Sequence, residues 1–373
     1  MPTPLNLQEL GERLRYVDQG LIALLSRRMS LALQIEEFKH AKGLPIFRPD
    51  IELKRLHQAE EWAKGYGINA EFARSIMYMI INEACKTQMI QWQGNHEAPR
   101  MNEDEWDAQL RENTLVLARK SAPFFDELRD THFPSTKLQE AFELSDIKFM
   151  TDDSDEKNCL LDLGCATGRQ SLPLKDMFDH VTGYDIGQEL ITVAQKKIPK
   201  GYKKRIAYRV WDVEKSIPLP SASVSHVLLG MGSASELRNI RKVLEEVHRV
   251  LIHGGLAFLS FYNKDTYLYK WKFLPWITGL ARQIDVAKEC VEVRLADGAP
   301  INIYGRAYGC DEIEDMMPRG LPIIRQVTHP VLSSILPDVL LDNGPILDSI
   351  ANIDKHLENE NVGAYIYASA RKS

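Results

Sequence analysis

An acidic residue and two glycines form the turn of this chain that is best suited to chemistry. Asp162 lies in the apolar run of residues 158–163, and Gly164 and Gly168 follow it. Glycines after a strand let the backbone approach a ligand closely. N–H groups at the start of a following helix can donate hydrogen bonds to an anionic part of that ligand. The sequence therefore predicts a strand, a ligand-binding turn and a helix, in that order.

A second acidic residue ends the next predicted strand. Asp185 closes residues 180–185 and lies 21 positions after Gly164. A carboxylate in this position can accept hydrogen bonds from both ribose hydroxyls of a nucleoside. Asp162, Gly164 and Gly168 give the spacing Asp-x-Gly-x-x-x-Gly, which differs from the Gly-x-Gly-x-x-Gly of dinucleotide dehydrogenases. The spacing therefore favours a nucleoside ligand of another kind.

A separate set of charged residues lies near the start of the chain. Residues 7–39 carry apolar side chains at seven-residue spacing, which predicts one long helix with an apolar seam. Arg28 interrupts the seam, and burying a guanidinium is costly unless an anion meets it. Lys39 lies about 20° from Arg28 around the helix and about 16 Å further along its axis. The two cations can converge on a small dianion, or Arg28 can form a structural ion pair with Glu52.

Two further helices complete the predicted helical domain. The second starts at Pro49, which suits a first helical turn, and ends at Gly65. The third is capped by Asn69 and runs to about residue 93, with Gln88 on its buried stripe. The pattern changes near residue 95. We therefore expect a helical domain at residues 1–95, which packs its seam against other helices or a second subunit, a linker and packing helix at 96–130, and an α/β domain at 131–373.

Short apolar runs alternate with helical patterns in the rest of the chain, which is typical of an α/β domain with a parallel sheet. The last part adds a hairpin, a helix and two closing antiparallel strands, predicted near residues 291–304, 312–317, 323–327 and 362–368. An insertion at about residues 332–357 separates the last two strands. Together with the nearby Trp276 and Tyr308, it is expected to form a lid over the substrate.

Composition argues against several classes of protein. The 373 residues suffice for two domains, and the net charge of −6 is unlike that of a nucleic-acid-binding protein. The five cysteines include no Cys-x-x-Cys pair, and no metal-ligand cluster has a recognisable spacing, so we expect no metal. No apolar stretch approaches the roughly 18 residues of a membrane helix, and the first residues lack the pattern of a secretory signal. We therefore expect a cytoplasmic protein without a membrane partner.

The helical region resembles the all-helical, type II chorismate mutases and their isochorismate pyruvate lyase relatives. The resemblance covers about residues 5–93 and is carried by residues 28–32, Lys39, 44–46, Glu52 and 83–88. It implies an intertwined homodimer of three-helix chains that encloses a dicarboxylate. In this family arginines hold the carboxylates, and a lysine and a glutamine flank the breaking ether oxygen. The site residues implied here are Arg28, Lys39, Glu52 and Gln88.

Three positions depart from that family's pattern. Two family arginines are Gly11 and Ile51 here, and a small hydroxylic residue is Ala84. Loss of one buried carboxylate ligand removes about 2–5 kcal/mol from such a site. The candidates to compensate are Arg13, Arg15 and Arg48. The alternatives are an efficient mutase and a module that senses a ligand or only dimerises, and the missing arginines favour the second.

The α/β region resembles the class I S-adenosylmethionine-dependent methyltransferases of the ubiquinone and menaquinone pathways, which have a Rossmann-like fold. The resemblance covers about residues 105–270, and its motifs are the glycine turn with Asp185 and residues 208–213, 224–230 and 249–260. It implies S-adenosylmethionine as the cofactor, with its amino group on Asp162, its ribose on Asp185 and its adenine on Asp212. The residues implied to bind it are Asp162, Gly164, Cys165, Gly168, Asp185, Ile186, Asp212, Val213, Gly230 and Met231.

Methyl transfer requires alignment of the nucleophile, methyl group and sulfur, and a base only if the nucleophile loses a proton. The candidates on the acceptor side are Tyr262, Asp265 and His329. Taken together, the sequence predicts a homodimeric methyltransferase that acts on a small aromatic or chorismate-derived metabolite. A bifunctional mutase (or lyase) and methyltransferase is the first alternative. A non-catalytic protein that senses ligands is the second.

Overall fold

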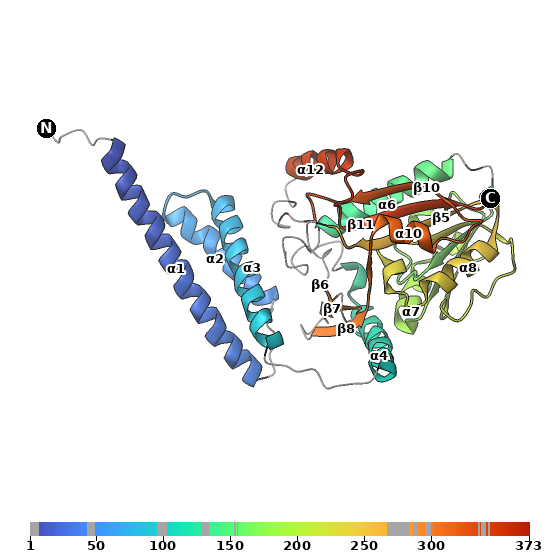
Figure 1. Ribbon diagram of the computed structural model, residues 1–373, viewed down its shortest axis with the longest axis horizontal. Helices are drawn as coiled ribbons and strands as arrows, with labels where there is room; N and C mark the ends of the chain where they lie inside the picture. The colour runs from blue at the N-terminus through green and yellow to red at the C-terminus, as the bar shows by residue number, and fades with distance from the viewer. Residues whose placement is uncertain are drawn as a thin grey trace. The chain divides into compact units, whose positions relative to one another are not determined.

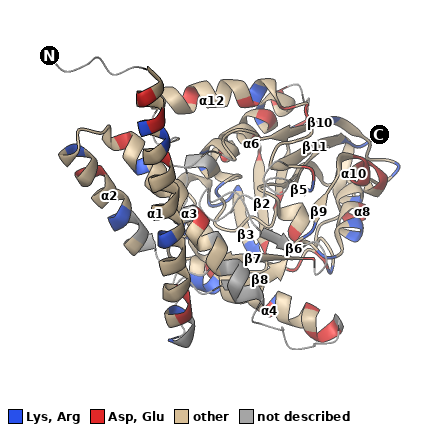
Figure 2. Ribbon diagram, turned by 60° about the vertical axis from the view of Figure 1, so that its left-hand side comes forward, with Lys and Arg blue, Asp and Glu red and all other residues tan. Residues whose placement is uncertain are grey.

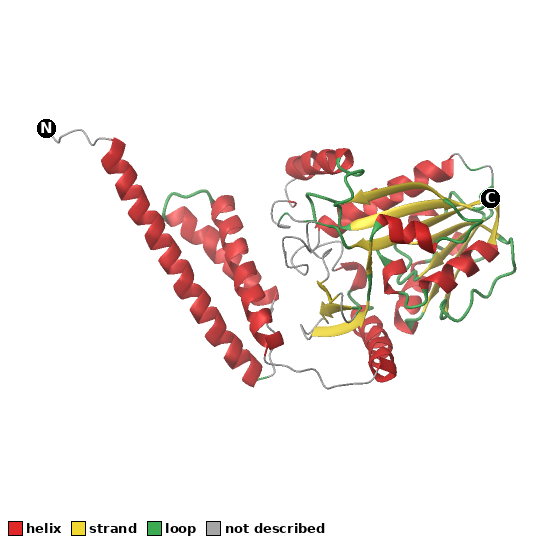
Figure 3. Ribbon diagram, in the orientation of Figure 1, coloured by secondary structure: helices red, strands yellow, loops and turns green. Residues whose placement is uncertain are grey.

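The computed structural model describes most of the chain, in two compact units, of which the second begins at Met101. The described residues are 7–42, 49–94, 103–127, 134–152, 154, 156–266, 283–285, 289–294, 300–334, 336, 341 and 344–373. In the first unit these residues are helical, whereas the second combines helices with strands (Figure 3). Among the described residues, no helix is both long enough and apolar enough to cross a membrane.

Three helices form the first unit, as the sequence predicts: α1 (Leu7–Ala41), α2 (Pro49–Gly65) and α3 (Ala70–Gly94) (Figure 1). The side chain of Asn69 caps α3, because its Oδ1 accepts a hydrogen bond from the backbone N–H of Phe72 at 2.8 Å. Packing of α1 and α2 on α3 buries small and medium apolar side chains, such as Leu56 and Ile81. This interior is narrow, and it covers only part of α1.

The apolar seam of α1 stays exposed within its unit. The exposed fraction of its members ranges from 41% at Ile35 to 86% at Leu7. The members are Leu7, Leu10, Leu14, Val17, Leu21, Leu24, Leu31, Ile35 and Phe38. Soluble monomers rarely leave such a large contiguous apolar surface in water.

A twisted sheet with the order β10-β11-β5-β4-β1-β2-β3 is the centre of the second unit. The strands that position the candidate site are parallel: β1 (Cys159–Leu163), β2 (His180–Asp185), β3 (Ile206–Val210), β4 (Val224–Leu229) and β5 (Leu251–Asn263). The closing strands β10 (Ile323–His329) and β11 (Tyr365–Arg371) are antiparallel, and the short β9 (Ala307–Tyr308) pairs with β5. The expected Rossmann-like α/β fold is confirmed.

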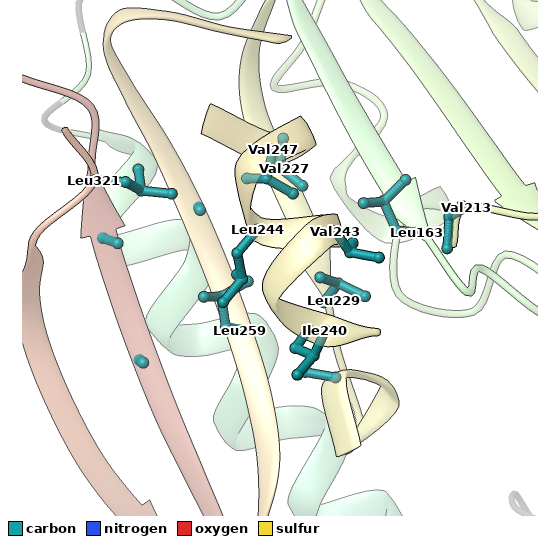
Figure 4. Packing of buried hydrophobic residues seen from close by; sticks show 14 of the residues in the cluster. Leu163, Val213, Val227, Leu229, Ile240, Val243, Leu244, Val247, Leu259 and Leu321 are labelled. Atoms are coloured by element: carbon teal, nitrogen blue, oxygen red, sulfur yellow. The ribbon is translucent and has the colours of Figure 1, made fainter. Parts of the chain in front are cut away.

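Helices cover both faces of this sheet. On one face, α8 (Ile240–Val250) packs Val243, Leu244 and Val247 against strand residues such as Leu229 and Leu259 (Figure 4), and α10 (Cys310–Met316) joins the same core. On the other face, α6 (Pro134–Asp152) and α7 (Gln188–Lys197) contribute to a second core. The carboxyl ends of the parallel strands are therefore fixed from both sides.

A small antiparallel sheet of β6 (Gln283–Asp285), β7 (Cys290–Arg294) and β8 (Pro300–Tyr304) contains the predicted hairpin. The helix α4 (Glu103–Ser121) packs on β8, and the Asn113 side chain donates a hydrogen bond to the Asn302 carbonyl at 2.7 Å. A further helix, α12 (Gly344–His356), lies in the insertion where the sequence predicts a lid. Trp276 lies outside the described residues.

The prediction of a helix after the glycine turn is wrong. Only a short 3-10 turn, Leu172–Leu174, follows Gly168. Pro173 supplies a physical reason, because proline lacks an N–H group and disfavours an α-helical conformation of the residue before it. Any anionic part of a ligand at this turn therefore meets backbone N–H groups of the turn itself and not those of a long helix.

Candidate functional site

A cavity of about 600 Å³ lies at the carboxyl ends of β1, β2 and β4. Nine of the ten residues expected to bind the cofactor line it, which shows that the glycine turn with Asp185, residues 208–213 and the end of β4 converge in space, whereas the motif at residues 249–260 contributes none. The nine residues are Asp162, Gly164, Cys165, Asp185, Ile186, Asp212, Val213, Gly230 and Met231. Gly168 does not line the cavity. Its φ is +73°, and a Cβ there would lie 2.7 Å from the Tyr208 hydroxyl, so this glycine instead makes room for Tyr208 below the turn.

Asp185 is held rigidly where β2 ends. Its Oδ2 accepts the Ala166 N–H at 2.9 Å, and its Oδ1 accepts the Gly187 N–H at 2.7 Å. Burial raises the pKa of this carboxyl group above its ordinary value. Each carboxylate oxygen can accept more than one hydrogen bond. The group is therefore preorganised to receive two further donors, as a ribose diol would supply.

Asp162 is the most deeply buried acid of the cavity lining, with an exposed fraction of 2%. Its Oδ2 accepts a hydrogen bond from the Ser171 hydroxyl at 2.6 Å. Burial, together with the smaller effect of the nearby carboxylates of Asp185 and Glu143, raises the pKa of this carboxyl group to about 7. A ligand with an ammonium group would relieve this burial cost, which is the role expected of Asp162.

Asp212, which is expected to meet the adenine, has a partner that sequence reasoning missed. Arg111 of α4 lies 2.5 Å from the Asp212 carboxylate (Nη2 to Oδ2) and also lines the cavity. The same helix contributes Leu110, Thr114 and Leu117, and β8 contributes Tyr304. In the described part of residues 332–357, no side chain lines the cavity. In the part of the chain that the structure describes, α4 and β8 are the elements that cover it.

The candidates on the acceptor side lie behind the cavity wall. Tyr262 is 3% exposed, and its hydroxyl donates a hydrogen bond to Glu236, which does line the cavity. His329 is also 3% exposed, stacks on Tyr367 at 4.3 Å and has its Nε2 3.5 Å from Asp146. Neither His329, Tyr262 nor Asp265 is a lining residue. Tyr308 packs on Phe261 in the core and does not line the cavity either.

The charges around the cavity suit a cationic ligand. Seven carboxyl groups and three guanidinium groups belong to its described lining. Trp211, Val213 and Ile186 provide apolar surface beside the acids at the ends of β2 and β3. A nucleoside with a sulfonium and an ammonium group therefore fits the acidic and apolar parts of this lining. In the described residues, no group of His, Cys, Asp and Glu side chains could hold a metal ion.

A second cavity, of about 300 Å³, lies within the helical unit. Arg28, Lys39 and Gln88 line it together with Arg55, which sequence reasoning missed although it lies one helical turn after Ile51. Arg28 donates to the Ile80 carbonyl at 3.2 Å, and Gln88 donates to the Ala32 carbonyl. The side chain of Glu52 lies outside the described residues, so its pairing with Arg28 stays a prediction.

Two of the proposed compensating arginines, Arg13 and Arg15, do not reach this cavity in a single chain. Arg13 and Arg15 are exposed on α1, and Arg15 pairs with Glu12 at 3.1 Å. Neither is a lining residue. Arg48 lies outside the described residues, whereas Ala84 lines the cavity as expected. Three cations and no acid are found in the described lining, which suits an anion with an apolar body.

Family models match both units. A methyltransferase domain model matches residues 161–259, and a chorismate mutase type II model matches residues 10–89. The fold, the cavity at the strand ends and the match to the methyltransferase model define the second unit as a methyltransferase domain. The chain thus carries a type II chorismate mutase domain followed by a methyltransferase domain.

Similar proteins match one part of the chain each. The T-protein of Haemophilus influenzae is 30% identical over 78 residues, which are 21% of each chain, so the chain spans about a fifth of that relative. The 4-amino-4-deoxychorismate mutase of Streptomyces pristinaespiralis is 29% identical over 25% of this chain and 71% of its own. The ubiquinone biosynthesis O-methyltransferase of Pelagibacter ubique is 29% identical over 44% of this chain and 75% of its own. A solved DhpI complex with S-adenosylmethionine is 15% identical over 70% of this chain and 98% of its own, with a TM-score of 0.45.

Proposed function

We propose that the chain transfers a methyl group from S-adenosylmethionine to a small metabolite. The observation that carries this proposal is the convergence of the glycine turn, Asp162 and Asp185 on one acidic cavity at the ends of parallel strands. When bound, the cofactor supplies an electrophilic methyl group on a sulfonium. Asp185 would hold the ribose, Asp162 the ammonium group, and α4 with β8 would exclude water from the methyl group.

The acceptor that we favour is an aromatic or chorismate-derived acid. The fusion to a chorismate mutase domain supports this class, as does the similarity to an O-methyltransferase of ubiquinone biosynthesis. Such a fusion is an associational argument, so the test must be chemical. The full chain would be incubated with S-adenosylmethionine that carries a deuterated methyl group and with a panel of hydroxybenzoates, arylpyruvates and a metabolite extract. Mass spectrometry should show one acceptor that gains the labelled methyl group. Binding of the cofactor without any labelled product would instead favour a ligand-sensing protein.

The helical unit supports a second candidate function, the binding of a dianion such as chorismate. Arg28, Lys39 and Arg55 line a cavity whose other walls are largely apolar. Because Gly11 and Ile51 replace two family arginines, we expect binding with slow or no rearrangement. Loss of the ultraviolet absorbance of chorismate on addition of the protein would instead indicate a bifunctional enzyme.

Replacement of Arg28 by methionine is expected to weaken chorismate binding by about 10-fold to 100-fold, the value of a hydrogen bond between charged groups. Calorimetric titration of the full chain measures the change. Arg27→Met is the matched control, since the Arg27 side chain is exposed and does not line the cavity. Equal affinities of the two variants would contradict the proposed anion site.

A homodimer through α1 is the third part of the proposal. The seam of α1 is exposed within its own unit, and long stretches of the helix carry no charged residue (Figure 2). A second copy of the chain supplies a surface of matching length and chemistry. Such pairing would also bring one protomer's α1 beside its partner's.

The double substitution Val17→Glu/Leu24→Glu should convert this dimer to monomers. Each position is about two-thirds exposed in the single chain, at 66% and 64%. Burial of each such side chain contributes about 1.5–3 kcal/mol, which a buried carboxylate would reverse. Sedimentation equilibrium measures the mass, and Gln19→Glu is a control that adds charge without removing apolar surface. A monomeric wild-type chain would overturn the proposal.

A further inference from the structure

One buried carboxyl group lies directly behind the wall of the methyltransferase cavity. Glu143 of α6 is 1% exposed, and it does not line the cavity. Its two oxygens accept the Met231 backbone N–H at 2.9 and 3.0 Å, and Oε1 also accepts the Ser260 hydroxyl at 3.1 Å. The side chains of Gln139, Gln170 and Tyr367 donate hydrogen bonds to it as well.

These donors come from separate segments that meet at the cavity. Met231 follows β4, Gln170 follows the glycine turn, Ser260 lies in β5 and Tyr367 lies in β11. Met231 and Gln170 line the cavity. The Gln170 amide fills the space beside Gly230, where a Cβ would lie 1.7 Å from the Gln170 Oε1. Glu143 thus connects the segment after β4, through Met231, with the segment after the glycine turn, through Gln170. The cofactor is expected to lie between these two parts of the cavity lining.

The hydrogen bonds favour an ionised Glu143, whereas its burial favours the neutral form. All of its partners offer donors, which suits a carboxylate that only accepts. A protonated carboxyl group would add a donor of its own, which would face the donors of these partners. Burial raises the pKa of this carboxyl group to about 7. The titratable groups that face it are Tyr367 from β11 and Asp162 from β1. His329 of β10 stacks on Tyr367, and Glu140, one turn earlier on α6, is occupied by Arg169 at 2.6 Å.

We propose that Glu143 is a positioning residue for the cofactor: its ionised carboxylate fixes the Met231 backbone and the Gln170 amide, and its protonation loosens this wall of the cavity. The inference rests on the proposed methyltransferase function. Since Glu143 acts through Met231 and Gln170, it touches neither the cofactor nor the acceptor. Binding of a nucleoside thioether should then tighten as the pH rises through 7.

The probe that isolates Glu143 is 5′-methylthioadenosine, because it lacks the ammonium group that Asp162 is expected to meet. Its affinity for the wild-type chain, measured by calorimetry, should increase about tenfold from about pH 6 to about pH 8. Glu143→Gln should bind it more weakly at the higher pH and show a flat profile. Glu245→Gln is the control, as Glu245 is exposed on α8 and does not line the cavity.

Hydrogen exchange of the backbone around Met231 gives a readout that is independent of ligand. Glu143→Gln should lose protection there, and Glu245→Gln should not. A flat affinity profile in the wild-type chain would overturn the inference even if Glu143→Gln does not fold, and so would a variant with an unchanged profile. If the wild-type chain binds neither this probe nor S-adenosylhomocysteine at any pH, the proposed function fails instead.

Discussion

Replacement of Asp185 by alanine is expected to weaken S-adenosylmethionine binding by about 1.5–3 kcal/mol, which is roughly a 10-fold to 150-fold increase in Kd. Two effects contribute. The variant loses the acceptor for the ribose hydroxyls, and the Ala166 and Gly187 N–H groups lose the carboxylate that holds the turn. Calorimetric titration of the full chain measures the loss.

The control for this variant lies next to the same strand. Asp179 precedes β2 at its opposite end and is exposed, so Asp179→Ala should leave the affinity unchanged. A thermal unfolding curve of each variant separates loss of the ligand contact from loss of the fold. An Asp185→Ala chain that binds as tightly as the wild type would rule out the assigned ribose contact.

Cofactor binding should release protons near neutral pH. Asp162 has a pKa of about 7 in the folded chain, against 3.8 ordinarily, so the folded state holds a proton on it that the unfolded state has lost. The contribution of Asp162 to the stability of the ligand-free domain therefore falls as the pH rises from 3.8 to about 7. The ammonium group of the cofactor favours the ionised form of Asp162, whereas burial alone favours its protonated form. Affinity should consequently rise with pH, with release of about half a proton per ligand from Asp162 at pH 7.

Titrations with S-adenosylhomocysteine in two buffers of different ionisation enthalpy measure this release. Asp162→Asn should reduce the release and weaken binding, whereas it should change the binding of 5′-methylthioadenosine much less, since that probe lacks the amino-acid part. Release that is identical in wild type and Asp162→Asn would show that Asp162 does not meet the ammonium group.

Local sequence patterns predicted the strands and the residues that follow them. Gly164 and Asp185 could be placed because the carboxyl ends of neighbouring parallel strands share one edge of a sheet, whereas Asp212 was placed by the resemblance to the methyltransferases. The same reasoning predicted a helix after Gly168, where Pro173 allows only a short turn. Periodicity also predicted the three helices of the first unit and the cap at Asn69.

Contacts between segments far apart in the chain could not be predicted in this way. Arg111 meets Asp212 across 101 positions, and Glu143 meets Met231 across 88, so neither spacing carries a periodic signal. The contact of Tyr262 with Glu236, which lines the cavity, is likewise a contact between separate segments. Arg55 was within reach of sequence reasoning, since residues four apart share one helical face.

Titration of the full chain with S-adenosylmethionine and, separately, with NADH tests the central assignment most directly. We expect saturable binding of one S-adenosylmethionine per chain and no measurable heat from NADH. Binding of the dinucleotide in its place, or no heat from either ligand, would contradict it.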